Sequence, residues 1–169
     1  MYKSRDFIFM DVLDLKGEKL GYIKDVLINF SKREVIGFRV TPYKLFRKTF
    51  SVLIEDVIYF NGSMVINKID KEEYLAFSDI KKMYVIDKNS KTLGIVKEII
   101  FDGETFEIKA LSIAYSLITS MFRERKILLI KDMILGENNL LYIGCEDKYK
   151  FYCIPHGNFF NIGESNVKR

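Results

Sequence analysis

Cysteine and histidine residues near the C-terminus are the first candidates for chemistry in this sequence. Cys145, Cys153 and His156 lie close together, and thiolate and imidazole groups are zinc ligands. A structural zinc site needs four ligands, commonly as two close pairs, and no second pair accompanies these three. A catalytic cysteine must also meet its histidine base in a cleft, which one short segment does not predict. We therefore expect no metal, no cofactor and no cysteine catalysis.

Four aspartates at matched positions could in principle supply acid–base pairs. They are Asp14, Asp56, Asp87 and Asp132. Each lies at a strand end or in a turn, where an aspartate usually accepts hydrogen bonds from nearby backbone N–H groups. The segment Gly17-x-x-x-Gly21 lacks the Lys-Ser/Thr that completes a phosphate loop. We expect a protein that is not an enzyme.

Two basic-aromatic segments are the best candidates for binding a partner. The first covers residues 43–50 and the second residues 114–126. Arginine, tyrosine and phenylalanine are common anchors in protein interfaces, and the same types can hold a nucleic-acid backbone and stack bases. The predicted contact residues are Tyr43, Phe46, Arg47, Lys48, Phe122, Arg123 and Arg125.

Three interpretations of these segments stay open. They bind a protein partner, or they bind RNA, or Phe46 and Phe122 plug the ends of their domains while the charges are solvated. Glu124 takes the place of Lys48 in the second segment, which lowers its positive charge and disfavours RNA. A net charge of +4 over 169 residues is also mild for a nucleic-acid-binding protein.

The elements that must position these segments occur twice. A set of residues in the first half returns in the second at an offset of 73 (94 minus 21), and further downstream at 76 (122 minus 46). The first set is Val12, Asp14, Leu20, Gly21, Ile23, Val26 and Ile28, and its counterpart is Val85, Asp87, Leu93, Gly94, Val96, Ile99 and Phe101. A duplicated unit of about 70 residues indicates two domains of one fold.

Alternation of apolar and polar residues predicts short strands in both copies. They are expected over 7–12, 21–30, 35–41, 50–54, 57–60 and 64–66, and again over 83–86, 93–101, 106–113, 126–130, 133–135 and 140–143. Asn61-Gly62 is the strongest hairpin signal. Six short strands joined by tight turns favour a small closed or nearly closed barrel, because closure removes exposed edges.

The domain boundaries follow from the repeat. We expect a first barrel over 1–69, a short helical linker over 70–77, a second barrel over 78–150 and a C-terminal extension over 151–169. Asp70 is the expected N-cap of the linker helix. The predicted fold class is all-β, with two six-stranded β-barrels in tandem, each around a core of its own.

The repeated motif resembles the PRC-barrel family. It stands as Val12-x-Asp14-x-x-Gly17-x-x-Leu20-Gly21-x-Ile23-x-x-Val26, and again as Val85-x-Asp87 followed by Leu93-Gly94-x-Val96-x-x-Ile99. The turn glycine of the first copy becomes Ser90 in the second, which the turn should tolerate. The resemblance covers most of the chain.

The resemblance implies six-stranded barrels that dock other molecules and share no catalytic residues. Such proteins include the cytoplasmic part of a photosynthetic reaction-centre subunit, the C-terminal domain of a ribosome-maturation factor and small proteins of spore-forming bacteria. We expect a bacterial, non-catalytic docking or scaffold protein, with an RNA- or ribosome-associated module as the alternative. The polar start of the chain and the short apolar runs predict a cytoplasmic protein without a transmembrane segment. We further expect a protein partner of unknown identity, and formation of a homodimer is an additional expectation.

Overall fold

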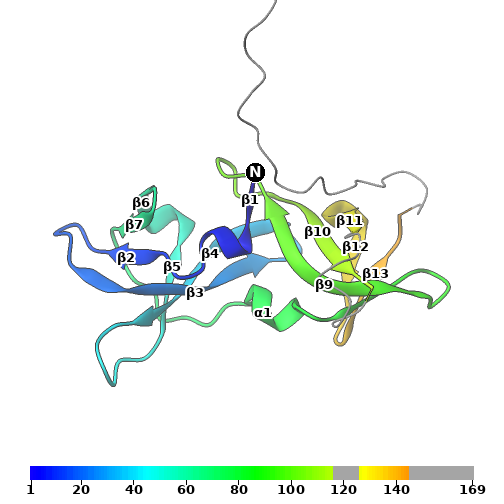
Figure 1. Ribbon diagram of the computed structural model, residues 1–169, viewed down its shortest axis with the longest axis horizontal. Coiled ribbons are helices and arrows are strands. Elements are labelled where there is room, and N and C mark those ends of the chain that lie inside the picture. The colour runs from blue at the N-terminus through cyan, green and yellow to red at the C-terminus, as the bar shows by residue number, and fades with distance from the viewer. Residues whose placement is uncertain (116–125, 145–169) are drawn as a thin grey trace, which may run out of the picture.

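The computed structural model describes residues 1–115 and 126–144, which form two curled β-sheets of the same topology (Figure 1). The strand orders are β5-β4-β3-β2-β7-β6 and β11-β10-β9-β8-β13-β12, so matching repeats occupy matching places. The first sheet contains β2 (Asp11–Leu13), β3 (Lys19–Asn29), β4 (Glu34–Pro42), β5 (Phe50–Leu53), β6 (Val57–Phe60) and β7 (Ser63–Ile66). The second contains β8 (Tyr84–Ile86), β9 (Thr92–Phe101), β10 (Ile108–Ala114), β11 (Lys126–Leu129), β12 (Met133–Leu135) and β13 (Asn139–Tyr142). The prediction of two six-stranded units of one fold in tandem is confirmed.

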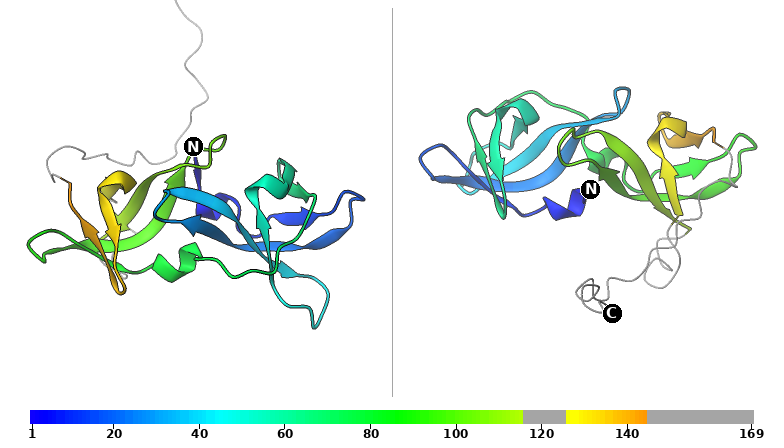
Figure 2. Two further views of the ribbon diagram at one scale, coloured as in Figure 1. Left: turned by 180° about the vertical axis from the view of Figure 1, so that it is seen from behind. Right: turned by 90° about the horizontal axis from the view of Figure 1, so that it is seen from above.

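Each sheet is a half-barrel whose two end strands are consecutive in the chain. The strand β5 leads through the 3-10 helix η2 (Ile54–Asp56) into β6, and β11 leads through η4 (Ile130–Asp132) into β12. The last residue of each 3-10 helix accepts a backbone hydrogen bond of 2.8 Å, Asp56 from Asn67 and Asp132 from Ile143. These bonds hold the curl at the same point in both copies, and Figure 2 shows the two half-barrels side by side.

Most strands lie where alternation predicts them, but the first expected strand, 7–12, is wrong over its first part. Residues 7–9 form a turn, and β2 begins only at Asp11. Phe9 has a φ of 70°, which a strand does not allow. The turn buries Phe7 and leaves Phe9 77% exposed, although the two side chains would share one face of a strand.

The predicted linker helix over 70–77 is also wrong. Residues 71–75 are not helical, and the short helix α1 comes later, at Phe77–Ile80. Asp70 pairs instead with Ser51 at the edge of β5, with N–O distances of 2.8 Å in both directions. Its carboxylate accepts the backbone N–H two residues ahead at 2.8 Å, so the residue expected to cap a helix closes a turn.

The first turn of each sheet confirms the structural role predicted for Asp14 and Asp87. The Oδ1 atom of Asp14 accepts the N–H groups two and four residues ahead, both at 2.9 Å. Asp87 accepts the equivalent two N–H groups, both at 2.8 Å. The residue three places after each aspartate has a positive φ, 81° at Gly17 and 63° at Ser90. The two turns therefore share one conformation, although only the first has glycine where it is needed.

The repeated glycine of the motif is required by a close approach of two strands. A Cβ atom on Gly21 would lie 2.2 Å from the carbonyl oxygen of Thr41. A Cβ atom on Gly94 would lie 2.7 Å from the carbonyl oxygen of Ala114, at the same place in the second copy. Any side chain would push the long strand β3 from β4, or β9 from β10, so glycine recurs.

The two copies exchange the segments that precede their sheets, which we call lead segments (residues 2–6 and 75–79). The strand β1 (Tyr2–Lys3) pairs with β9 of the second copy, where Lys3 faces Ile100. In return Ala76 pairs with Leu27 on β3 of the first copy. The two contacts join equivalent residues, since Ile100 lies 73 residues after Leu27 (100 minus 27) and Ala76 lies 73 residues after Lys3 (76 minus 3). The contacts are thus related by a pseudo-twofold axis, as in an isologous dimer.

Each lead segment is held by a buried carboxylate of the other copy. The 3-10 helix η1 (Ser4–Asp6) starts at Ser4, whose N–H lies 3.1 Å from Oε1 of Glu98 and whose hydroxyl also donates to that oxygen. The N–H of Ser78 in α1 donates to Oδ2 of Asp25 at 3.2 Å. Glu98 and Asp25 are equivalent positions (98 minus 25 is 73) and are only 5% and 8% exposed. Both buried carboxyl groups therefore have hydrogen-bond donors from the opposite repeat.

The turns after β3 and β9 exchange backbone hydrogen bonds in the same way. The N–H of Ile108 donates to the carbonyl of Arg33 at 2.7 Å, and the N–H of Val35 donates to the carbonyl of Phe106 at 2.8 Å. The two hydrogen bonds are equivalent, because Ile108 lies 73 residues after Val35 (108 minus 35) and Phe106 lies 73 residues after Arg33 (106 minus 33). Arg33 and Phe106 both have positive φ, 62° and 57°, which turns their carbonyls toward the other copy.

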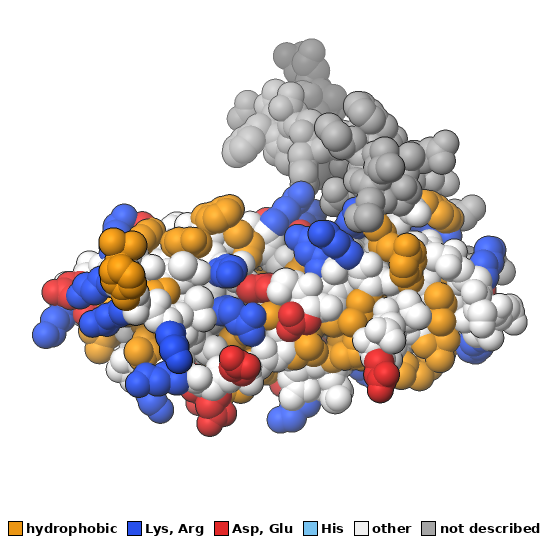
Figure 3. Space-filling view, turned by 90° about the horizontal axis from the view of Figure 1, so that it is seen from below, with side chains coloured by type: hydrophobic (Ala, Val, Ile, Leu, Met, Phe, Trp, Pro, Cys, Tyr) orange, Lys and Arg blue, Asp and Glu red, His pale blue; other side chains and the backbone are white. Residues whose placement is uncertain are grey.

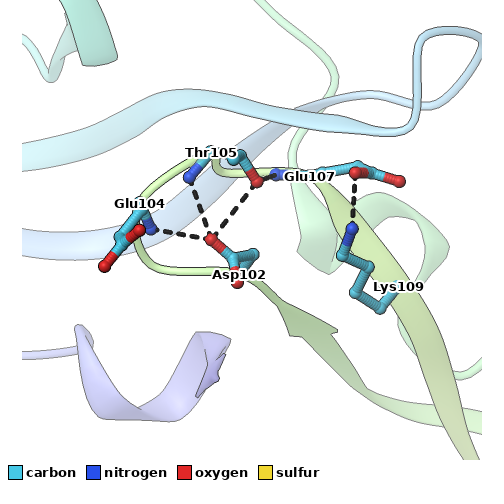
Figure 4. Close-up of polar contacts among 5 residues, drawn as sticks. All are labelled: Asp102, Glu104, Thr105, Glu107 and Lys109. Carbon is cyan, nitrogen blue, oxygen red and sulfur yellow. Dashed lines mark hydrogen bonds and ion pairs between the residues drawn. The ribbon is translucent and has the colours of Figure 1, made fainter.

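The pseudo-twofold axis passes between Glu34 and Glu107, which are equivalent residues and face each other in an antiparallel bridge. Figure 4 shows the turn that leads to Glu107. The Oδ1 atom of Asp102 accepts the N–H groups of Thr105 at 3.0 Å and Glu104 at 2.9 Å, and also the Thr105 hydroxyl at 3.2 Å. These donors lower the pKa of Asp102. The carboxylate of Asp102 thus holds the turn that leads into the bridge between Glu34 and Glu107.

Aromatic rings from both copies join the two half-barrels into one core. Phe7 lies at the centre, with ring centroids at 5.0 Å from Phe38, 5.3 Å from Tyr2, 5.4 Å from Phe60 and 5.6 Å from Phe101. The first three partners belong to the first repeat and the last to β9 of the second. Most buried apolar residues of both copies belong to a single cluster, so the expectation of a separate core in each copy is wrong.

Truncating the central ring should unfold both copies together. We expect Phe7→Ala to lower the free energy of unfolding by about 3–5 kcal/mol, because it leaves a cavity among four rings. Chemical denaturation followed by fluorescence and circular dichroism should show one transition moved to lower denaturant. The control is Phe9→Ala, whose ring is 77% exposed and which should cost little. Two separate transitions, only one of them shifted, would contradict a shared core.

The unmatched turn residue offers a stabilising change. Ser90 holds a φ of 63°, which disfavours any residue with a Cβ, so Ser90→Gly should raise the free energy of unfolding by about 0.5–1 kcal/mol. The reverse change, Gly17→Ser, should lower it by a similar amount. Thermal and denaturant unfolding of the two variants measure both effects. Changes of the same sign in the free energy of unfolding of the two variants would refute the equivalence of the turns.

Candidate functional site

The first predicted contact segment is an exposed loop between β4 and β5. Pro42 ends β4 and Phe50 begins β5, and every residue from 43 to 49 is exposed. The side chain of Phe46 is fully exposed at 103%, and Leu45 is 84% exposed. The interpretation that Phe46 plugs the end of its domain is therefore wrong.

A cavity of about 460 Å³ lies beside this loop. Its apolar lining comes from Leu20 on β3, Pro42, Phe50 and Ile69, so four separate stretches of the first repeat meet there. Its charged lining is mostly basic, with a single acidic residue, Glu18. The basic residues are Lys19, Lys44, Arg47, Lys48 and Lys71. The site combines an apolar interior with a positive rim.

Ion pairing neutralises only one of these cations. The Nζ atom of Lys19 lies 2.5 Å from Oδ2 of Asp11, and this contact raises the pKa of Lys19 and lowers that of Asp11. Within residues 1–115 and 126–144, no ion pair involves the other four basic residues of the rim. Figure 3 shows Lys and Arg side chains gathered with apolar ones at the end of the molecule formed by the first repeat. The rim thus carries positive charge available to a ligand.

Tyr43 anchors the loop instead of pointing freely into solvent. Its hydroxyl donates to Oδ1 of Asp11, the carboxylate that also binds Lys19, and this hydrogen bond raises the pKa of Tyr43. Its ring centroid lies 5.8 Å from that of Tyr22, which in turn lies 5.9 Å from Phe9. Tyr43 therefore holds the start of the loop against β2 and β3, and the residues after it project outward.

The structure brings together only part of the predicted contact set. Arg47 and Lys48 line the cavity, whereas Phe46 stands outside its lining. The predicted residues of the second segment lie outside the described residues. These are Phe122, Arg123 and Arg125.

Sequence reasoning missed the contributions of Ile69 and Lys71 to the site. Both belong to the stretch after β7, and the sequence predicts a linker helix at Lys71. They reach the cavity because Asp70, between them, pairs with Ser51 on β5. The sequence does not predict that pairing, because a single isolated bridge produces no alternation of apolar and polar residues.

The described part of the chain has neither a cluster of metal-ligating side chains nor a helix that could span a membrane. No cluster of three or more metal-ligating side chains occurs there. None of the helices described is long and apolar enough to cross a bilayer. Cys145, Cys153 and His156 lie outside the described residues.

Comparison with protein families agrees with the duplicated half-barrels. The sequence model of the PRC-barrel domain matches the chain twice, over residues 1–73 and 72–130. The chain belongs to the PRC-barrel family. Comparison with curated proteins finds no match. In this PRC-barrel protein the first match covers all six strands of the first sheet, and the second covers β8 to β11 and ends before β12 and β13. The strand β1 lies within the first match but pairs with the second sheet.

The contacts around Asp11 predict a measurable change in the pKa of its carboxyl group. We expect its pKa to lie below the ordinary carboxyl value, so the anchor of the loop is complete at neutral pH and is lost only as pH falls through the lowered pKa. Lys19→Gln should raise the pKa of Asp11 most and Tyr43→Phe less, in the order of their contributions. Side-chain carboxyl NMR measures this, with Lys91→Gln as a distant control. An unchanged pKa in Lys19→Gln would contradict the contact.

Proposed function

We propose that this PRC-barrel protein is a non-catalytic docking protein that binds a protein partner through the loop at residues 43–50. The observation that carries the proposal is the exposure of Leu45 and Phe46 beside a cavity with an apolar interior and a basic rim. Exposed apolar side chains gathered at a loop are typical of protein interaction sites. An aromatic side chain next to arginine is also the usual composition of an interface anchor.

A protein partner is favoured over RNA by the kind of surface that surrounds the charges. Binding of single-stranded RNA needs several aromatic faces for successive bases. In this loop Phe46 is fully exposed, whereas Tyr43 packs against Tyr22 and its hydroxyl is used by Asp11. The apolar lining from Leu20 and Ile69 gives a phosphate no partner but suits an apolar side chain.

A non-catalytic role is supported by what the recurrent carboxylates do. Asp14 and Asp87 each accept two backbone N–H groups of their own turns, which leaves them poorly placed for proton transfer. The buried pair Asp25 and Glu98 hold the lead segments. The bacterial origin, the cytoplasmic location and the formation of a homodimer stay predictions from the sequence.

Affinity capture with loop variants tests the proposal. The double variant Phe46→Ala/Arg47→Ala should lose most of a partner captured by the wild-type protein, because it removes the exposed anchor and one rim cation. The matched control is Leu15→Ala/Lys16→Ala, which removes an exposed apolar and a basic residue from another loop of the same repeat. Retention of every wild-type partner by the first variant would refute the anchors. Capture of RNA that falls steeply with added salt would support the alternative module.

A further inference from the structure

We infer that the ligand of this site is an acidic peptide segment of a partner protein that carries one large apolar side chain. The apolar side chain enters the cavity beside β5, and the acidic residues on either side pair with the rim. This inference rests on the proposed docking function and specifies the partner that the same site takes.

The size and lining of the cavity define the apolar part of the ligand. A volume of about 460 Å³ is within the range of small ligand sites and holds one large side chain with its flanking backbone. Leu20, Phe50 and Ile69 supply the apolar contacts, and Ile69 is itself 42% exposed in the free protein. Covering that surface with an apolar side chain removes it from water, which favours binding.

The charges of the rim define the rest of the ligand. Lys44, Arg47, Lys48 and Lys71 lie around the cavity with no ion pair among the described residues, against one acidic neighbour, Glu18. A basic segment would be repelled by this rim, and a neutral one would leave its charges without partners. An acidic segment is attracted over a distance and is aligned on arrival.

The cations come from two different stretches of the chain that meet at the cavity. Lys48 lies on the loop just before β5, and Lys71 lies on the stretch after β7. The second stretch is fixed by the backbone pair between Asp70 and Ser51, at 2.8 Å in both directions. The backbones of both stretches therefore meet at the strand β5, next to the cavity that Lys48 and Lys71 line.

An extended segment fits the surface better than a small anion of the size of the cavity. Leu45 and Phe46 stand outside the cavity lining and would stay uncovered by a ligand confined to it. A second hollow, of about 940 Å³, shares Lys48 and Lys71 with the first, and the rest of its charged lining is mixed, with Lys24 and Arg39 beside Glu72, Glu73 and Asp79. A peptide that crosses the cavity can cover the exposed loop at one end and enter the second hollow at the other.

Binding of synthetic peptides to the full chain tests the inference. The probe is a fluorescent peptide of Glu and Asp residues around one central Phe. Two comparison peptides replace the Phe by Gly, or the acidic residues by Gln and Asn. We expect the probe to bind about tenfold more tightly than either comparison peptide in fluorescence anisotropy at low salt. Equal binding of all three peptides would overturn the inference.

Charge removal on the protein gives the second part of the experiment. Lys48→Gln/Lys71→Gln should weaken binding of the probe about tenfold, whereas Lys88→Gln/Lys91→Gln, an equal charge change on an exposed turn of the second repeat, should change it less than about twofold. Equal effects of the two variants would show that only net charge matters and would overturn the site. Circular dichroism of both variants checks that they fold.

Two outcomes separate this inference from the proposed function. If Phe46→Ala/Arg47→Ala abolishes capture of the natural partner but the acidic probe does not bind, docking stands and the acidic chemistry is wrong. If the acidic probe binds as expected and the same variant keeps every natural partner, the site is real but is not the docking site. Polyuridylate that displaces the probe and binds more tightly would assign the rim to RNA and overturn the inference.

Discussion

Exchange of the lead segments is the constraint on which the rest of this structure depends. Lys3 pairs with Ile100 on the second sheet, and Ala76 pairs with Leu27 on the first. Each exchange buries a carboxylate, Glu98 or Asp25, that would be costly to leave without donors. Neither repeat keeps all of its own partners, so the tandem behaves as one internally symmetric unit.

The shared aromatic core follows from that exchange. A repeat of about 70 residues is close to the size at which a single core is marginal. Phe7 enters between the sheets directly after η1, where it contacts rings of both repeats. The core therefore contains residues of both repeats, from Phe7 to Tyr142, and part of the surface between the repeats is buried.

The candidate site lies in the first repeat of a duplicated fold. The hydrogen bonds that shape the turns recur in both copies, as do the close approaches at Gly21 and Gly94. The cavity, in contrast, is built from residues of the first repeat between β3 and the stretch after β7. Backbone geometry was duplicated with the fold, whereas the side chains on its surface are free to differ.

The sequence by itself determined the repeat, the strands and the turns, because these depend on contacts among neighbours in the chain. Alternation located β6 and β12 at the residues where they occur, and Asp14 and Asp87 close the turns expected of them. The basic-aromatic loop was also visible as a segment. Only the tertiary structure decided that the lead segments cross over, and that Ile69 and Lys71 join Lys48 at one cavity. The physical reason is that a backbone hydrogen bond is the same whether its partner lies in one repeat or the other. The choice is made by packing between residues far apart in the sequence.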